Sequence, residues 1–202
     1  MDVSFGFKAH SGWAALVSVG RAGGGYAVAE RRRVELVEET WAKAPYHAAE
    51  ELEAGRARRL VERAVAAAHR GAAREMRAAL AREGERGNQV RACGVLVGSP
   101  MPPWSVDEIR AVHPRMHQAE GALFRDALLR AAEACGIRVV PIPEKQLVAR
   151  AERALGMPAG RLLKLAASLG KALGPPWGRD QKDAALAAMV AQDLSTDVYR
   201  SR

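Results

Sequence analysis

A short segment near the middle of the chain combines histidine and carboxylate side chains at helical spacing. It reads His113-Pro-Arg-Met-His117-Gln-Ala-Glu120, so the second histidine follows the first by four residues and the glutamate by seven. On an unbroken helix these three side chains share one face. Neutral imidazoles together with a carboxylate are ligands that suit zinc or iron. The spacing therefore defines a candidate metal site formed by His113, His117 and Glu120.

A second His-x-x-Glu unit, His47 to Glu50, lies at the start of an earlier helical pattern. Two such units on facing helices are a ligand arrangement found in di-iron bundles. A structural interpretation competes with this one, because Pro114 interrupts hydrogen bonding in the first turn and can leave His113 ahead of the helix. A histidine and a glutamate one turn apart also often form only a surface hydrogen bond. With no cysteine ligand and no third cluster in the sequence, we favour the structural interpretation and keep the metal site as an alternative.

The elements that must position these residues follow from the hydrophobic pattern. Short apolar segments bounded by turn residues predict strands at residues 3–8, 13–19, 26–37, 90–97 and 137–142. Apolar residues at three- and four-residue spacing predict helices at residues 47–85, 106–135, 145–155, 159–173 and 180–194. Gly71 is a candidate break in the first helix, and Pro114 is expected to disturb the second. Ser105 and Glu108 form a capping-box pattern at the start of the second helix.

The order of these elements predicts the topology. Short turns make the first three strands an antiparallel meander. Each later strand follows a helix, and such crossovers join parallel strands. The sequence therefore predicts an α/β fold with a mixed five-stranded sheet, three antiparallel strands followed by parallel additions, and helices on both faces. We expect residues 1–202 to form one domain, because no repeat, low-complexity tract or linker divides the chain.

Short motifs at both ends of the chain occur in the order found in a known family. The first strand reads Phe5-Gly6-Phe7-Lys8 and is followed by Gly12-Trp13-Ala14. Near the other end, Val139-Val140-Pro-Ile-Pro-Glu144 precedes a helical pattern at residues 161–173 and then Asp180-Gln-Lys-Asp183-Ala-Ala-Leu-Ala187. In these motifs and in element order, the chain resembles the ribonuclease H-like superfamily, specifically its Holliday-junction resolvase (RuvC-like) branch.

The resemblance implies a two-metal site for phosphodiester hydrolysis. In such a site, carboxylates from separate elements hold two divalent ions ~4 Å apart, one activating water and one stabilising the leaving oxygen. The resemblance assigns this role to Asp180 and Asp183 on the last helix, and their i, i+3 spacing puts both on one helix face. Mg²⁺ or Mn²⁺ is the implied cofactor.

Lys8 departs from the family pattern. It stands where the first strand of the family supplies a bridging aspartate, and an ammonium group there repels metal ions. The fourth strand, which ends in Val97-Gly98-Ser99-Pro100, also lacks the glutamate that the family places nearby. Lys8 can instead pair with Asp180 or Asp183, which predicts a catalytically degenerate domain that binds nucleic acid or a partner protein. The alternative is an active divalent-metal nuclease that uses both aspartates with another, unrecognised acid.

The charge balance is compatible with a nucleic-acid partner. The chain has 31 Lys and Arg residues against 23 Asp and Glu residues, a formal net charge of +8. Residues 145–182 hold eight basic side chains and only two acids, Glu152 and Asp180. Such a surface attracts phosphate, although it also serves solubility alone. The candidate nucleic-acid contacts are Arg150, Arg153, Arg161, Lys164, Lys171 and Lys182.

Bulk features predict the cellular setting. Apolar residues make up 49% and charged residues 27% of the chain, which is typical of a globular protein. Cys93 and Cys135 lie far apart in apolar contexts, which predicts two free thiols in a reducing compartment. No signal-peptide pattern and no apolar run of ~20 residues occurs. We therefore expect a soluble cytoplasmic protein with no membrane partner. The resemblance implies a homodimer, but no apolar stripe in the sequence marks its interface.

Overall fold

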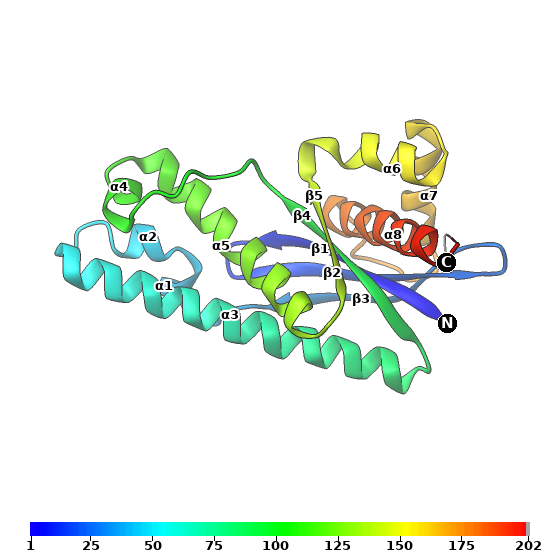
Figure 1. Ribbon diagram of the computed structural model, residues 1–202, viewed down its shortest axis with the longest axis horizontal. Helices are drawn as coiled ribbons and strands as arrows, with labels where there is room; N and C mark the ends of the chain where they lie inside the picture. The colour runs from blue at the N-terminus through cyan, green and yellow to red at the C-terminus, as the bar shows by residue number, and fades with distance from the viewer. Residues whose placement is uncertain (201–202) are drawn as a thin grey trace.

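One mixed β-sheet organises the computed structural model, which describes residues 1–200 (Figure 1). The strands are β1 (Asp2–His10), β2 (Trp13–Ala22), β3 (Gly25–Glu35), β4 (Gln89–Val97) and β5 (Arg138–Pro143), in the spatial order β3-β2-β1-β4-β5. The first three strands pair antiparallel, whereas β4 pairs parallel to β1 and β5 parallel to β4. The predicted meander with two parallel additions is therefore confirmed.

One face of the sheet packs against two long helices, α3 (Ala54–Glu85) and α5 (His113–Ala134). Phe5 and Phe7 of β1 point to this face and share an apolar cluster with Phe124 of α5. Most of the remaining helix residues in this cluster are alanines, which allow the helices to lie close to each other and to the sheet. The core therefore reaches high density with few aromatic side chains.

The first predicted helix begins later than expected. The sequence predicted one helix from residue 47, but two short helices, α1 (Thr40–Lys43) and α2 (Pro45–Ala48), precede α3. The carboxylate of Glu53 accepts hydrogen bonds from the first free backbone N–H groups of α3, which sets the start of that helix. His47 consequently lies on α2, a separate element from the long helix.

Gly71 does not break α3, although the sequence made it a candidate break. The helix runs without interruption from Ala54 to Glu85. A Cβ atom at residue 71 would lie 1.8 Å from the carbonyl oxygen of Leu36. Glycine is therefore required here by the close contact between α3 and the chain just after β3, and the helix tolerates its lower propensity.

The second predicted helix is also divided, into α4 (Val106–Arg110) and α5. The predicted capping box is present at the start of α4: the hydroxyl of Ser105 accepts a hydrogen bond from the Glu108 backbone, and the Glu108 carboxylate accepts one from the Ser105 backbone. Pro114 lies in the first turn of α5, where its missing N–H would have no intrahelical partner. The proline therefore begins the helix and does not disturb it.

The opposite face of the sheet is covered by α8 (Arg179–Arg200). A Cβ atom at Gly6 of β1 would lie 1.8 Å from the carbonyl oxygen of Ala184, and one at Gly94 of β4 would lie 2.4 Å from that of Ala187. Glycines on the strands thus meet alanines on the helix. This close contact holds α8 at a defined height above β1 and β4.

Two further helices, α6 (Leu147–Leu155) and α7 (Ala159–Leu169), pack beside α8 (Figure 1). A short 3₁₀ helix, η1 (Glu144–Gln146), connects β5 to α6. The predicted helices on both sheet faces are therefore confirmed. Both cysteines are free, and burial raises the pKa of the Cys93 thiol. In the part of the chain that the structure describes, no helix is long and apolar enough to cross a membrane.

Candidate functional site

Lys8 lies where β1, η1 and α8 meet. Its side chain leaves β1 on the same face as Gly6, because residues two apart in a strand point to the same side. The Lys8 Nζ atom is 2.7 Å from Oδ2 of Asp183 and 3.0 Å from Oε1 of Glu144. Oδ1 of Asp180 lies 3.6 Å away. One ammonium group therefore contacts three carboxylates that come from two other elements.

Burial and the neighbouring negative charges shift the pKa of the Lys8 ammonium in opposite directions. The Lys8 side chain is only 9% exposed, whereas the three acids are 20–35% exposed. Burial by itself lowers the pKa of the Lys8 ammonium, but the hydrogen bonds and charges of Asp183 and Glu144 outweigh it and raise that pKa above the ordinary value. Lys8 is therefore positively charged at neutral pH, and it neutralises part of the charge of the acids around it.

Glu144 is a site residue that the sequence interpretation missed. The family pattern places a glutamate after the fourth strand, whereas here the acid follows β5. Because β4 and β5 are parallel, with Val97 paired to Pro143, both strands end at the same edge of the sheet. The signal in the sequence was an acid directly after a parallel strand, since the carboxyl ends of parallel strands gather functional groups in this fold class.

Two further basic groups contact the aspartates. His10 Nε2 is 3.0 Å from Oδ2 of Asp180, and its ring stacks on Trp13. Arg179 Nε lies 3.6 Å from Oδ2 of Asp183. Asp180 and Asp183 therefore each contact one basic side chain besides Lys8. Beside this cluster a hollow of about 470 Å³ opens at the sheet edge, lined by Val97, Gly98, Ser99, Pro100, Pro143, Glu144, Lys145, Gln146 and Arg179.

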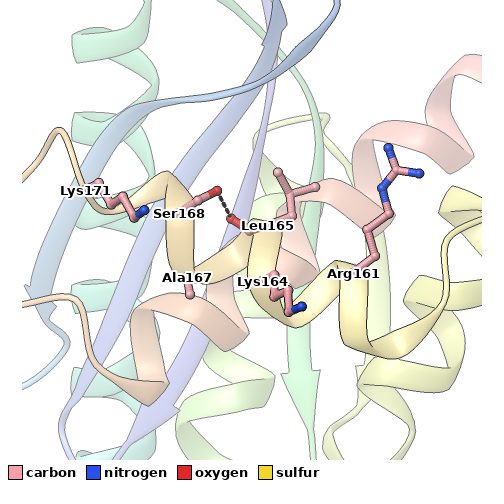
Figure 2. Close-up of a pocket in the computed structure, with 6 residues that line it drawn as sticks. All are labelled: Arg161, Lys164, Leu165, Ala167, Ser168 and Lys171. Carbon is pink, nitrogen blue, oxygen red and sulfur yellow. Dashed lines mark hydrogen bonds between the residues drawn. The ribbon is translucent and has the colours of Figure 1, made fainter.

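Four of the six predicted nucleic-acid contacts lie on or beside α7. Arg161, Lys164 and Lys171 line one open hollow of about 550 Å³ together with Ser168 (Figure 2). Lys171 also lines an adjoining hollow with Lys182. Arg161, Lys164 and Lys171 are exposed, and within the described residues no ion pair joins any of the four to an acid. Their charges are therefore available to a ligand.

Arg150 and Arg153 occupy α6 and line neither of these hollows. The Arg150 guanidinium donates a 3.3 Å hydrogen bond to the carbonyl oxygen of Pro141, so part of its donor capacity is used within the protein. Arg153 is exposed. The structure thus separates the predicted basic set into a continuous patch on α7 and two residues on the preceding helix.

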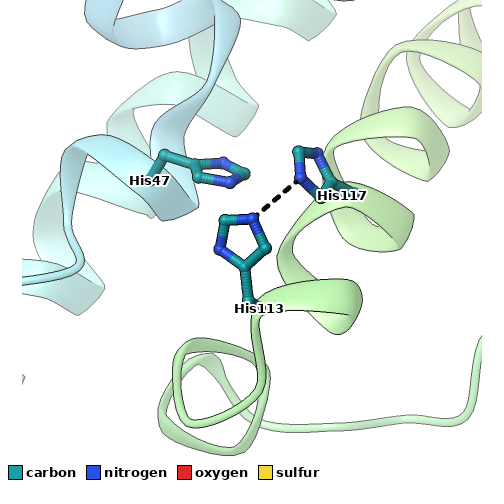
Figure 3. A group of neighbouring side chains, drawn as sticks. All are labelled: His47, His113 and His117. Carbon is teal, nitrogen blue, oxygen red and sulfur yellow. Dashed lines mark hydrogen bonds between the residues drawn. The ribbon is translucent and has the colours of Figure 1, made fainter.

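The predicted histidine pair gains a third member in the structure. His113 and His117 of α5 converge with His47 of α2 (Figure 3), and one ring nitrogen from each residue lies within 4.8 Å of the others. Glu120, predicted as a ligand with the pair, contacts His47 in a different way. Its two carboxylate oxygens are each 2.9 Å from Nδ1 of His47, and Oε1 also accepts hydrogen bonds from the backbone N–H groups of Tyr46 and His47.

Comparison with known proteins bears on the fold. No protein-family model matches the chain, and no curated protein gives a significant match. The solved structure of Thermus thermophilus RuvC is similar, with a TM-score of 0.53 and 14% identity over 97% of this chain and 96% of that chain. The chain has a ribonuclease H-like fold. At this level of identity, the likeness concerns the fold and not the activity.

Within this fold, Lys8 departs from the residue type that the family resemblance assigns to the first strand. The family resemblance assigns an aspartate to this position of the first strand and two carboxylates to the last helix. In this chain Asp180 and Asp183 of α8 and Glu144 of η1 all contact Lys8. The ammonium of Lys8 lies among all three. The space between the carboxylates is thus occupied by a positive charge that belongs to the protein.

Proposed function

We propose that this chain is a catalytically degenerate ribonuclease H-like domain that binds nucleic acid. The observation that carries the proposal is the contact of Lys8 Nζ with Asp183, Glu144 and Asp180. A metal-dependent nuclease needs these oxygens to hold divalent cations. In this chain they contact an ammonium group, which supplies the positive charge that a divalent cation would otherwise supply.

Electrostatics explains why the ammonium and a divalent cation compete for this place. Two unit charges 4 Å apart interact with about 4 kcal/mol at an effective dielectric constant of about 20. The repulsion between Lys8 and a divalent cation at that distance is about twice as large. A cation at these carboxylates would also have to displace the two short contacts of Lys8 with Asp183 and Glu144. Lys8 therefore weakens the binding of Mg²⁺ at these carboxylates.

The nucleic-acid part of the proposal is supported by the basic patch on α7, defined here as Arg161, Lys164, Lys171 and Lys182. When exposed basic side chains without internal acid partners contact phosphates, the nucleic acid releases its condensed counterions, which makes binding strong at low salt. The patch belongs to the same sheet face as α8, and its member Lys182 lies on α8 one residue before Asp183. Its contacts would be with phosphates, which predicts little sequence preference.

A gel-shift and cleavage assay tests this function. We expect labelled four-way junction, duplex and single-stranded DNA to remain uncut with Mg²⁺ or Mn²⁺, and binding to weaken steeply as salt rises. Lys164→Ala and Lys171→Ala should each reduce the slope of log affinity against log salt by about one unit. Arg77→Ala is the matched control, because Arg77 is an exposed residue of α3 on the other face of the sheet.

Three outcomes of this assay would each contradict part of the proposal. Metal-dependent cleavage that disappears in Asp183→Asn would show an active nuclease that uses Asp180 and Asp183, with Glu144 as the additional acid. Absence of binding at every salt concentration would show that nucleic acid is not the ligand. Binding of a protein partner would then be the remaining function of the domain. Equal weakening by Arg77→Ala would show that net charge, and not the α7 patch, governs binding.

The role of the ammonium is tested separately by Lys8→Asp. This variant restores the acid that the resemblance assigns to the first strand, so we expect it to bind Mg²⁺ and to gain thermal stability from it. At a Mg²⁺ concentration of about 100 times the dissociation constant, linkage gives about 2.7 kcal/mol, which is roughly 5–10 °C for a chain of this length. Thermal unfolding with and without Mg²⁺ measures this. An equal Mg²⁺ effect on the wild-type chain would contradict the exclusion of metal by Lys8.

A further inference from the structure

The three histidines at the junction of α2 and α5 form a cluster that the nuclease fold does not require. His47 lies on α2, which packs against α3, α4 and α5, and His113 and His117 lie at the start of α5 (Figures 1 and 3). We propose that these three imidazoles bind one divalent transition-metal ion, with zinc as the best match, and that Glu120 orients His47 for this role. The inference is independent of the proposed nucleic-acid function, because it uses none of the same residues.

Glu120 determines which nitrogen of His47 faces the cluster. Its carboxylate contacts Nδ1 of His47 at 2.9 Å from both oxygens, so the proton of a neutral imidazole lies on Nδ1. The lone pair is then on Nε2. Metal-bound histidines almost always donate their other N–H group to a carboxylate or carbonyl in this way. Glu120 is 4% exposed and also accepts two backbone N–H groups of α2, so its position is well defined.

The Nε2 atom of His47 supplies an independent indication of a ligand. It is buried from solvent and has no hydrogen-bond partner among the described residues. A buried nitrogen with an unused lone pair is costly, because it has lost its contact with water. The neighbouring rings are His113 and His117, whose centroids lie 5.0 Å and 4.6 Å from that of His47. A metal ion between the three rings would satisfy this nitrogen.

The distances agree with a small coordination sphere. The Nε2 atoms of His113 and His117 are 3.1 Å apart. Two nitrogens bound to one tetrahedral Zn²⁺ at about 2.0–2.1 Å lie roughly 3.3 Å from each other. All three ligand nitrogens lie within 4.8 Å of one another, so a small rotation of the His47 ring completes the set. Without a metal, the His113–His117 contact is a hydrogen bond that requires one of the two nitrogens to carry a proton.

Local structure explains why the rings converge. His113 and His117 are four residues apart at the start of α5, where they project from one face. His47 is held on α2, whose first residue Pro45 is buried and whose last turn is anchored by Glu120. Behind the rings, Tyr46, Ile109 and Met116 form an apolar cluster, which fixes the distance between α2 and α5.

The ligand set indicates the class of metal and the kind of site. Three imidazoles without a coordinating carboxylate suit Zn²⁺ or a neighbouring transition metal, and not Mg²⁺ or Ca²⁺. Three protein ligands leave the fourth tetrahedral position for water or for a group from a partner. His113 and His117 are exposed, so this position opens to solvent. The site thus differs from a closed structural zinc site, in which the protein supplies four ligands.

Metal content of the tag-free chain tests the proposal. After removal of metal with a chelator and addition of Zn²⁺, we expect about one zinc per chain and a higher unfolding temperature with zinc than without. His113→Ala should abolish both effects, and its exposure means that the fold is retained. Glu120→Gln should still bind zinc, but roughly 10–100-fold more weakly. His69→Ala is the matched control, because His69 of α3 contacts Asp126 on a later turn of α5 and lies outside the cluster.

Cobalt substitution distinguishes these ligands from the two cysteines. Co²⁺ bound by three imidazoles should give visible absorption bands of a four-coordinate ion without a thiolate charge-transfer band. A wild-type chain that retains no zinc, or an equal loss of zinc in His69→Ala and His113→Ala, would overturn the proposal. A thiolate band would also overturn it, because the metal would then be held by Cys93 or Cys135.

Discussion

Replacement of Lys8 by alanine is expected to lower the free energy of unfolding by about 3 kcal/mol at pH 7, because it removes the positive charge from among three carboxylates. Asp183, Glu144 and Asp180 would then repel one another in a site where Lys8 is almost fully buried. The acids are partly exposed, so water offsets some of this repulsion and keeps the cost near the lower end of values for buried ion pairs. Urea unfolding of both chains measures the difference.

Lys164→Ala provides the control for this first prediction. Lys164 is exposed and pairs with no acid in the described part of the chain, so its loss should change stability by less than about 0.5 kcal/mol. The double variant Lys8→Ala/Asp183→Asn should be less destabilised than the sum of its two single variants, because the residues contact each other. A change of under about 0.5 kcal/mol for Lys8→Ala would show that the ion pairs contribute little to stability.

The contribution of Lys8 should also depend on pH. The pKa of its ammonium is raised in the folded chain, since the hydrogen bonds to Asp183 and Glu144 outweigh the opposing effect of burial. The folded state therefore binds this proton more tightly than the unfolded state. The stabilisation is fully present below the unfolded pKa of 10.5 and is lost as pH rises through the higher folded value. The stability difference between wild type and Lys8→Ala should accordingly narrow in strongly alkaline solution.

Gly6→Ala is expected to destabilise the chain by about 3 kcal/mol or more, because overpacking against backbone cannot be relieved by rotating a side chain. The new methyl group would lie 1.8 Å from the carbonyl oxygen of Ala184, so α8 would have to move away from β1. That movement would also carry Asp183 away from Lys8 and expose apolar residues of the second core cluster. The free energy of unfolding and the binding of a hydrophobic dye report these two effects.

Gly160→Ala is the matched control for the glycine prediction. Gly160 lies within α7, has an ordinary helical backbone, and a Cβ atom there would meet no atom within 4 Å. Alanine should therefore be neutral or should stabilise the chain by up to about 1 kcal/mol, because it restricts the unfolded state. If Gly6→Ala were tolerated as well as Gly160→Ala, α8 would not be held by close contact with β1.

Much of the fold could be predicted from local patterns in the sequence. Short apolar segments bounded by turn residues, short glycine turns and helical crossovers were enough to predict the mixed sheet and its parallel additions, since each depends on residues near one another in the chain. The capping box at Ser105 is local for the same reason. The pairing of Lys8 with an aspartate of the last helix could also be anticipated, but only from the family resemblance, which assigns both positions to one site.

Only the tertiary structure decided which residues complete the two polar clusters. Glu144 reaches Lys8 because β5 ends at the same sheet edge as β4, which depends on strand register. His47 joins His113 and His117 because α3 begins at Ala54 and leaves His47 on a separate short helix. Glu120 then faces His47 and not the other two rings. Strand register and helix ends are set by contacts between segments that are distant in the sequence, such as Gly71 against Leu36 and Gly6 against Ala184. The local sequence pattern does not contain those contacts.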